Sequence, residues 1–553
     1  MRHRIIAAIV GVSAFIFLAA TGADIGLTYD EPIYMTKSLQ AWEWLASGAP
    51  ADDASIEQYW QAAGEQQPGS IKLIFGIITN TLGQLLPLSP LAALRMGTIF
   101  LSALCLVGLY LFIARIWGTA AGLVASVGLL LMPRVFAHMH LAALDAPVMA
   151  LGFITVALVY MAAREDVVWP CVAAGVVFGL ALGTKLNAFF IPLIIIPWVL
   201  YYAPRRIRGW AVGSLLLVGP LAFFATWPWL WHDTFGRFAE YFRFHLHHYH
   251  VATTYFGQTW DLAPWHYAPV MLLITTPPIL LVLAAVGIYR TGTVGIFTCA
   301  ETEGTQPDAD SRPNGKFWHR AALALLIWGA IVNIAPSMLP FSPKYNGVRL
   351  FLPVMPYLAG LAGVGIAVLL RPVVECAERK LGAALHNARI ESQVLLVLAV
   401  ILPCMVAVGY SHPLGMSYYN SLVGGPSGAY ALGMEPTYWG DSYLQAVWWL
   451  NGKAQSGETA WINVPGFATS VQMYQSLGIM RPDLKISAGD EGLSDADYVV
   501  VQHKQNEMSE RMKYLAEHGR PLHAETLDGV PVVWIFAGDD PALKEFENAD
   551  IER

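Results

Sequence analysis

Long apolar stretches separated by short polar segments run through the first three quarters of the chain. About twenty apolar residues in a row are enough for a helix to cross a bilayer. Such stretches predict spanning helices at about residues 5–20, 91–113, 117–133, 145–163, 168–185, 187–203, 209–226, 268–289, 321–340, 348–370 and 393–411. The pattern therefore predicts a polytopic α-helical membrane protein.

The first apolar run follows the basic sequence Met1-Arg2-His3-Arg4. A basic start, an apolar run and small residues near Ala23 also fit a cleaved signal peptide. Both interpretations, a signal peptide or a retained span, place the residues that follow outside the cytoplasm.

A further apolar run at 71–88 is interrupted by Lys72, Thr79, Asn80 and Gln84. If this run does not span, fifteen Lys and Arg of residues 1–411 fall on the cytoplasmic side and nine fall outside; if it spans, the two numbers are exchanged. Cytoplasmic loops carry the excess of basic residues. The count therefore predicts eleven spans, an interfacial or re-entrant segment at 71–88, and a C-terminus outside the cytoplasm.

The composition agrees with a membrane protein. Of 553 residues, 56% are hydrophobic and 13% are charged, whereas ordinary soluble chains carry about 25% charged residues. A soluble enzyme, a disordered tail protein and a collagen are excluded, and the net charge of −7 excludes a nucleic-acid binder built on a basic domain. Residues 412–553 contain 9 Lys and Arg but 19 Asp and Glu, against 24 and 21 in residues 1–411. We therefore expect a membrane domain at 1–411 and an acidic, water-soluble domain at 412–553.

The acidic domain alternates strand-like and helical patterns. Apolar and β-branched residues predict strands at 459–464, 496–501 and 530–536, and residues 505–518 predict a helix. We expect a small α/β domain outside the cytoplasm.

The first outer loop, at 23–90, opens with the adjacent carboxylates of Asp30 and Glu31, and Pro32 then suits the first turn of a helix. Apolar residues recur after it at helical spacing, at Met35, Leu39, Trp42 and Ala46. They predict an amphipathic helix that lies on the membrane lipids. The two acids are candidates for chemistry, or they merely cap this helix.

Three more charged residues stand at the outer ends of expected spans. Asp145 begins the span at 145–163, where a carboxylate is costly unless it is used or paired. Pairing with Arg134 or with a helix N-terminus is the structural alternative. Lys185 and Arg349 either snorkel to lipid head groups or hold the phosphate of a lipid-linked donor.

Four histidines, His245, His247, His248 and His250, crowd the outer loop at 227–267. A zinc site needs three or four converging ligands, and an aromatic, histidine-rich interfacial loop explains the same residues. No metal is predicted, although a divalent ion stays open. No Walker loop, GxSxG, HExxH or Rossmann fingerprint occurs, so no cofactor is expected. An enzyme on this side needs a substrate that is already activated and already in the membrane.

Several short motifs follow one another along about residues 1–450. They are Asp30-Glu31-Pro32, Leu144-Asp145-Ala146-Pro147, Gly183-Thr184-Lys185, Trp265-His266-Tyr267-Ala268-Pro269, Arg349-Leu350-Phe351-Leu352-Pro353 and Tyr418-Tyr419-Asn420-Ser421-Leu422. In their order and sidedness they resemble the GT-C membrane glycosyltransferases. The group they resemble most is glycosyltransferase family 39, with its dolichyl-phosphate-mannose protein mannosyltransferases and bacterial aminoarabinose lipid A transferases. The chain departs from that pattern at Gln67-Pro68-Gly69, where the family often has His-Pro-Pro.

The resemblance implies a GT-C fold and a sugar transferase of a bacterial inner membrane. The donor would be a sugar on a polyprenyl phosphate, by default undecaprenyl phosphate, and the acceptor an extracytoplasmic protein, lipid or glycan. Asp30 would be the general base beside Glu31, and Asp145 would orient hydroxyl groups. The lipid phosphate would bind Lys185, Arg349 and Lys72, and further substrate contacts would come from His140, His266 and Tyr345.

Two rival interpretations stay open, a transporter or lipid-carrier flippase and a non-catalytic scaffold. A transporter places charges near mid-bilayer, often in repeated halves, whereas the acids here lie in outer loops and no internal repeat is visible. A scaffold leaves those acids without a role. The transferase interpretation requires Asp30 and Asp145 to face one outer cavity, with Lys185 or Arg349 across it.

Overall fold

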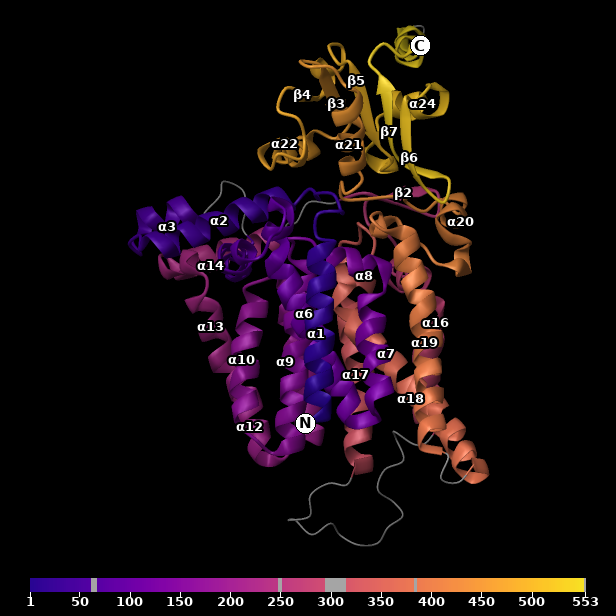
Figure 1. The fold of residues 1–553 in the computed structure, drawn as a ribbon. Coiled ribbons are helices and arrows are strands. Elements are labelled where there is room, and N and C mark those ends of the chain that lie inside the picture. Colours follow the sequence, from indigo (N-terminus) through magenta and orange to yellow (C-terminus); the bar gives the residue numbers. More distant parts are fainter. Residues whose placement is uncertain (61–66, 247–250, 294–314, 382–384, 552–553) are drawn as a thin grey trace.

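The computed structural model describes residues 1–60, 67–246, 251–293, 315–381 and 385–551. A bundle of long helices carries a small sheet domain at one end (Figure 1). The N-terminus and α12 lie at the opposite end of the bundle. We call the end that meets residues 412–551 the sheet end.

The bundle consists of apolar helices of unequal length. They are α1 (Arg2–Ala20), α6 (Pro90–Trp117), α7 (Thr119–Leu130), α9 (Asp145–Glu165), α10 (Trp169–Leu182), α11 (Ile191–Tyr202), α12 (Arg205–Gly213), α13 (Gly219–Ala225), α15 (Tyr267–Thr275), α16 (Pro278–Thr293), α17 (Gly315–Ile334), α18 (Met355–Leu381) and α19 (Leu385–Ser411). Short 3-10 turns, among them η1 (Leu186–Phe190) and η5 (Arg349–Val354), precede α11 and α18.

Every segment expected to span is formed by one or more apolar helices, which confirms a polytopic helical membrane protein. By length and composition, seven helices in the described residues are long enough to cross a membrane, or eight if the pair α15 and α16 counts as one span bent by 115°. Thr119–Leu130, Trp169–Leu182 and Leu186–Tyr202 are shorter apolar helices. These three and the bent pair account for the difference from the eleven expected spans.

Shorter elements cover the sheet end of the bundle. They are α2 (Glu31–Ser47), α3 (Asp53–Trp60), α4 (Ser70–Asn80), α5 (Leu82–Leu85), α8 (Pro133–His138), α14 (Thr234–Leu246) and the antiparallel hairpin of β1 (Thr253–Tyr255) and β2 (Gln258–Trp260). In Figure 1, α2, α3 and α14 lie across this end rather than along the bundle. The 71–88 segment breaks between α4 and α5 at Thr81, and neither helix is long enough to cross a membrane.

Helix α2 packs closely on α4. A Cβ on Gly76 of α4 would lie 2.3 Å from the Ser38 carbonyl oxygen, so this approach requires glycine at position 76. Met35 and Ser38 are buried on α2, whereas Leu39 is 42% exposed. The predicted apolar stripe therefore meets the protein at Met35, and its contact with membrane lipids stays a prediction.

The sheet domain is mixed α/β. The strands are β3 (Thr459–Ile462), β4 (Lys485–Ala488), β5 (Tyr498–Gln502), β6 (His523–Leu527) and β7 (Val530–Ala537), in the order β4-β3-β5-β7-β6. β3 pairs in parallel with β4 and β5, while β7 is antiparallel to β5 and β6. The helices are α20 (Gly425–Ala431), α21 (Tyr443–Lys453), α22 (Ala468–Ser476), α23 (Asp490–Leu493), α24 (Glu510–His518) and α25 (Pro541–Ile551).

All three predicted strands are present, and the helix expected over 505–518 is interrupted. A 3-10 turn at Gln505–Glu507 precedes α24, and Ser509 caps α24 by accepting a hydrogen bond from the Met512 amide at 3.3 Å. Strands β4 and β6 were not predicted.

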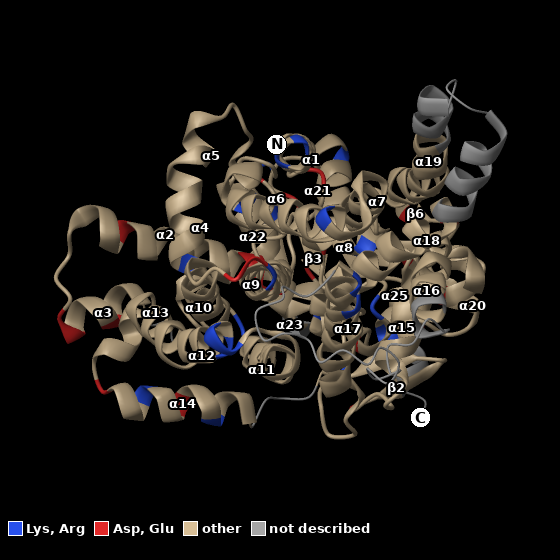
Figure 2. Ribbon diagram, turned by 90° about the horizontal axis from the view of Figure 1, so that it is seen from below, with Lys and Arg blue, Asp and Glu red and all other residues tan. Residues whose placement is uncertain are grey.

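Charged side chains are sparse in the bundle. Seen from the end opposite the sheet, most of the ribbon is uncharged, and basic residues mark α12 (Figure 2). The basic residues at the start of α12 are Arg205, Arg206 and Arg208.

Candidate active site

The segment before α2 is held by the C-terminal domain. The Tyr29 amide donates to the Trp439 carbonyl at 3.0 Å, and Ser470 Oγ donates to the Thr28 carbonyl at 3.2 Å. A Cβ at Gly26 would lie only 2.0 Å from the Asp441 carbonyl oxygen, so this approach requires glycine. The two halves of the chain therefore fix the entry to α2 together.

Asp30 stands at the N-cap position of α2, yet its side chain makes no capping hydrogen bond. Its Oδ2 instead accepts from Arg349 Nη2. The Asp30 side chain is 17% exposed. Capping therefore does not account for this carboxylate.

Glu31 points into the bundle and is fully buried. Arg95 binds it with two hydrogen bonds, Nε to Oε1 at 2.8 Å and Nη2 to Oε2 at 2.7 Å. The amides of Thr28 and Ala142 donate to the same carboxylate. Because its charge is paired and both oxygens are occupied, Glu31 serves here to fix the start of α2 to α6.

Asp145 begins α9 and joins two cations. Its Oδ1 accepts from Lys185 Nζ at 2.5 Å, and its Oδ2 accepts from Arg349 Nε at 3.0 Å. The side chain of Asp145 is 2% exposed, that of Lys185 13% and that of Arg349 11%. Arg134 is therefore not its partner.

These contacts form one continuous chain from Asp30 through Arg349 and Asp145 to Lys185. We call these four residues the charged cluster. It joins the starts of α2 and α9, the turn after α10 and the start of η5 at the sheet end. Arg349 therefore brings the two acids into one cluster, with Lys185 against Asp145, and the shared outer cavity stays a prediction.

Trp439 holds Arg349 from the side of the C-terminal domain. The guanidinium carbon lies 3.9 Å from the centroid of its ring. Trp439 is buried and has φ +70°, a left-handed conformation that is uncommon for a bulky residue. Backbone strain of this kind persists where the surroundings hold it, often at functional sites.

His138, at the end of α8, lies beside Trp439 with ring centroids 5.8 Å apart. Its Nδ1 lies 2.7 Å from the Arg134 carbonyl oxygen. Burial lowers the pKa of His138 to about 4, against a smaller opposing effect of Asp145. A neutral imidazole therefore borders the charged cluster.

The other predicted binding residues are distributed around the sheet end. Lys72 donates to the Gln67 carbonyl at 3.0 Å, and the amide of its neighbour Ile71 bonds the Gly183 carbonyl, close to the turn that bears Lys185. Tyr345 interacts electrostatically with the Arg349 guanidinium. Both therefore lie near the charged cluster.

The two predicted histidines lie elsewhere. His140 is fully buried, with Nδ1 2.7 Å from the Phe136 carbonyl oxygen and Nε2 2.8 Å from Thr21 Oγ1. Because both ring nitrogens are occupied within the protein, this side chain ties α8 to the end of α1. His266 precedes α15 and its Nδ1 lies 2.8 Å from the Tyr255 hydroxyl.

Of the four histidines singled out in the loop at 227–267, only His245 lies in the described residues. His245 Nδ1 lies 2.8 Å from the Tyr241 carbonyl oxygen. His247, His248 and His250 fall outside the described residues. Among the residues that are described, no group of three or more His, Cys, Asp or Glu is arranged to hold a metal ion.

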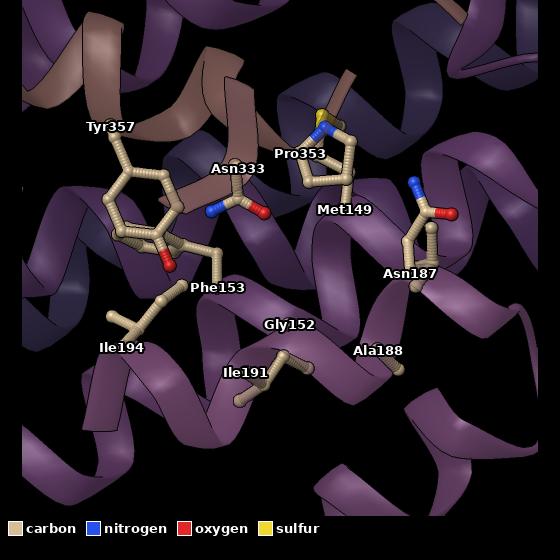
Figure 3. Close-up of a pocket in the computed structure, with 11 residues that line it drawn as sticks. Met149, Gly152, Phe153, Asn187, Ala188, Ile191, Ile194, Asn333, Pro353 and Tyr357 are labelled. Atoms are coloured by element: carbon tan, nitrogen blue, oxygen red, sulfur yellow. The ribbon is translucent and has the colours of Figure 1, made fainter. Parts of the chain in front are cut away.

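A small cleft lies in the bundle between α9, η1, α11, α17 and the start of α18 (Figure 3). Its cavity volume is about 10 Å³, which is room for about one water molecule. Its lining comes from the first turns of α9, from the segment after Lys185 and from the segment after Arg349, with Met149, Asn187 and Pro353 among the residues shown. Phe153, Ile194 and Tyr357 extend it along the helices.

Sequence reasoning gave no role to Arg95, His138 or Trp439. Arg95 had a usable signal, because an arginine within an expected span needs a partner. Trp439 had no such signal, since its contact with Arg349 joins distant parts of the chain.

Comparison with known proteins identifies a family over part of the chain. Residues 80–232 match the family model described as dolichyl-phosphate-mannose-protein mannosyltransferase. This match confirms the resemblance to GT-C glycosyltransferases that the motifs predicted. The matched segment contains Asp145 and Lys185.

The chain is also similar to solved structures. ArnT from Cupriavidus metallidurans in the apo state is 15% identical with a TM-score of 0.49, over 96% of this chain and 97% of that one. The same protein bound to undecaprenyl phosphate is 15% identical with a TM-score of 0.47, over 97% of this chain and 98% of that one. A third similar structure is the archaeal oligosaccharyltransferase AglB from Archaeoglobus fulgidus in complex with an inhibitory peptide and a dolichol-phosphate. It is 12% identical with a TM-score of 0.46, over 89% of this chain and 69% of that one. The chain matches no curated protein sequence.

Proposed function

We propose that the protein transfers a sugar from a polyprenyl-phosphate-linked donor to an acceptor outside the cytoplasm, with Asp30 as general base. The observation that carries the proposal is the charged cluster, in which Arg349 bridges Asp30 and Asp145 while Lys185 contacts Asp145. The family match over residues 80–232 supports a glycosyl transfer. The proposal leaves open whether the acceptor is a protein, a lipid or a glycan. It places the protein in a bacterial inner membrane.

In the proposed reaction an acceptor hydroxyl oxygen attacks the anomeric carbon of the donor sugar. The bond between that carbon and the phosphate oxygen breaks, the hydroxyl proton passes to Asp30, and polyprenyl phosphate leaves. Arg349 and Lys185 stabilise the negative charge that develops on the phosphate, and such preorganised groups contribute strongly in a site shielded from water. No metal or cofactor takes part in this scheme.

Arg349 couples the two ends of the reaction. In the structure its guanidinium is shared by the carboxylates of Asp30 and Asp145. A phosphate that binds Arg349 competes with Asp30 for the same N–H groups. Donor binding therefore frees an Asp30 oxygen to accept the proton, and a base within about 3 Å of that proton is what catalysis needs.

The test measures release of polyprenyl phosphate by the purified full-length protein. A panel of polyprenyl-phosphate sugars serves as donors and a membrane extract as acceptor source. We expect one donor to be consumed and Asp30→Asn to lower the rate by at least about 100-fold, the low end of general-base contributions. Asp53→Asn is the matched control, because Asp53 lies on α3 and pairs with Arg237, outside the charged cluster.

Two results would contradict the proposal. Equal release by Asp30→Asn would remove Asp30 from the chemistry. No release from any donor, while an authentic family member is active in the same extract, would favour the transporter or scaffold interpretation.

A further inference from the structure

The two cations of the charged cluster are carried by separate turns of the chain. Lys185 stands directly before η1, and Arg349 is the first residue of η5. These turns are joined by a hydrogen bond between uncharged groups, in which Asn187 Nδ2 donates to the Leu350 carbonyl at 2.9 Å. In the described part of the chain, no other hydrogen bond joins η1 to η5. The proposed mechanism gave Asn187 no role.

The Leu350 carbonyl is open to this bond because of Pro353. In a 3-10 helix a carbonyl accepts from the amide three residues later, and Pro353 has no N–H to donate. η5 is kinked at this place, where Phe351 leaves the helical conformation with φ −120° and ψ 19°. A backbone carbonyl normally has a partner, and here Asn187 provides it. Asn187 and Pro353 both line the small cleft in Figure 3.

Asp145 alone does not fix the spacing of the two cations once a substrate is bound. In the structure its Oδ1 accepts from Lys185 and its Oδ2 from Arg349, while the two cations repel each other. A phosphate that binds the cations competes with Asp145 for them and weakens this attraction. The hydrogen bond of Asn187 involves no charge, so it is not subject to that competition.

We propose that Asn187 is a positioning residue that sets the distance between Lys185 and Arg349, so that both cations reach oxygens of one phosphate. The inference rests on the proposed function, in which this phosphate is the leaving group of the lipid-linked donor. Both cations already contact the two oxygens of one carboxylate, that of Asp145, so their spacing suits adjacent oxygens of a single anion. A displacement of about 1 Å in a catalytic site is enough to lower a rate by about 100-fold.

Binding of undecaprenyl phosphate tests the proposal without turnover. The apparent Tm of the full-length protein in detergent is followed during titration with this lipid, and the rise gives an apparent affinity. Undecaprenol, which lacks the phosphate, is the control ligand. Asn187→Leu keeps the approximate size of the side chain and removes its N–H donor. We expect this variant to weaken the apparent affinity for undecaprenyl phosphate about tenfold, as for one misplaced charged hydrogen bond.

A double-mutant cycle tests whether Asn187 acts through Lys185. Lys185→Gln removes one of the two cations, so the spacing no longer matters in that background. We expect Asn187→Leu to weaken the affinity about tenfold when Lys185 is present and about twofold or less in Lys185→Gln, because interacting positions are not additive. Equal weakening in both backgrounds would overturn the proposal.

A second variant separates positioning from stability, because Asn187→Leu also leaves the Leu350 carbonyl without its partner. Pro353→Ala restores an N–H three residues after Leu350, so the carbonyl can be satisfied within η5. We expect Asn187→Leu/Pro353→Ala to recover the Tm measured without ligand, while its affinity for undecaprenyl phosphate stays low, since η1 and η5 are still not joined. Recovery of both would assign Asn187 to stability alone. If Asn187→Leu does not fold, the double variant carries the affinity measurement.

The release assay adds a readout of rate. We expect Asn187→Leu to lower kcat for polyprenyl phosphate release by about 10- to 100-fold and to leave the KM for the acceptor extract unchanged, because the cations act on the leaving phosphate. Asn333→Leu is the matched control. Asn333 lines the same cleft, but its Nδ2 donates to the Gly329 carbonyl of its own helix at 2.8 Å. This variant should keep the wild-type affinity and kcat.

The outcomes separate this inference from the proposed function. A wild type that releases polyprenyl phosphate, with unchanged affinity in Asn187→Leu, overturns the role of Asn187 and leaves the proposed function. A wild type that binds undecaprenyl phosphate but releases none contradicts the transfer, and the affinity cycle still decides the role of Asn187. A wild type that neither releases polyprenyl phosphate nor binds undecaprenyl phosphate better than undecaprenol overturns both.

Discussion

At the scale of single residues, Glu31 and Arg95 show how a carboxylate beside a candidate base becomes structural. Both side chains are fully buried, and Arg95 also donates to the carbonyls of Gly22, Ile25 and Gly26. Removal of one partner leaves the other charge buried and unpaired, at a cost of about 3–5 kcal/mol. We expect Glu31→Gln and Arg95→Gln each to lower the apparent Tm strongly.

The double variant Glu31→Gln/Arg95→Gln tests that the loss comes from the pair. We expect it to be less destabilised than the sum of the two single variants, because neither charge is then left alone. Thermal unfolding of the four proteins in one detergent measures the difference. Strictly additive losses would contradict the pairing.

Asp441 makes a pH-dependent contribution to stability. Its Oδ2 has no partner among the described residues, and burial raises its pKa to about 7 from an ordinary value near 3.8. Between these two values the unfolded chain has lost the proton that the folded protein keeps, so stability falls as the pH rises through this window. We expect Asp441→Asn to flatten the decline in apparent Tm between pH 5 and pH 8. At pH 8 the apparent Tm of the variant should be higher than that of the wild type. An unchanged decline would show that Asp441 is not the group responsible.

The charged cluster could be predicted from the sequence because Asp145, Lys185 and Arg349 each stand at an end of an apolar run and Asp30 lies in the outer loop that follows the first run. A charge at such a place is conspicuous, and the sidedness of the runs brings all four to one face. The roles of Glu31 and His140 could not be predicted in this way. Each depends on partners distant in the sequence, Arg95 for the acid and Thr21 for the imidazole.

At the scale of elements, length decided what could be predicted. Apolar runs near twenty residues fix a helix whatever it packs against, so the expected spans all appear as helices. The face that a helix buries depends on its neighbours, so the close approach of Gly76 on α4 to Ser38 on α2 could not be predicted. Strands β4 and β6 are the two edges of the sheet, and half-exposed edge strands lack the apolar run by which a strand is recognised.

The turn at Trp439 is the element through which the C-terminal domain acts on the charged cluster. Its ring lies against Arg349 and its carbonyl binds the Tyr29 amide, next to Asp30. Shielded cation–π contacts contribute about 2 kcal/mol, which corresponds to about 30-fold in rate if the contact orients Arg349 in the transition state. We expect Trp439→Leu to lower kcat for polyprenyl phosphate release by that order, and Trp439→Phe, which keeps a ring, to lower it less.

A matched control separates this effect from general damage. Trp448, on α21, is 48% exposed and lies outside the charged cluster. Trp448→Leu should leave kcat unchanged. A Trp439→Leu variant with normal kcat and a lowered Tm would assign Trp439 to stability alone.

At the scale of the whole molecule, the proposal depends on which side of the membrane the sheet end faces. Basic residues at the start of α12 lie at the opposite end of the bundle (Figure 1), and such residues mark the cytoplasmic side. On this assignment we expect the charged cluster to lie outside the cytoplasm, where no nucleotide-sugar is supplied and a lipid-linked donor would be required.

Single cysteines in intact cells test this orientation. The native thiols Cys105, Cys171 and Cys404 are buried, and Cys299→Ser with Cys376→Ser removes the remaining two. In this background, Gln455→Cys lies on the exposed surface of the sheet domain and Arg206→Cys on the exposed start of α12. We expect a membrane-impermeant maleimide to label Gln455→Cys in intact spheroplasts, and Arg206→Cys only after permeabilisation. The reverse pattern would place the charged cluster on the cytoplasmic side. The positive-inside assignment and the extracytoplasmic acceptor would then both be wrong.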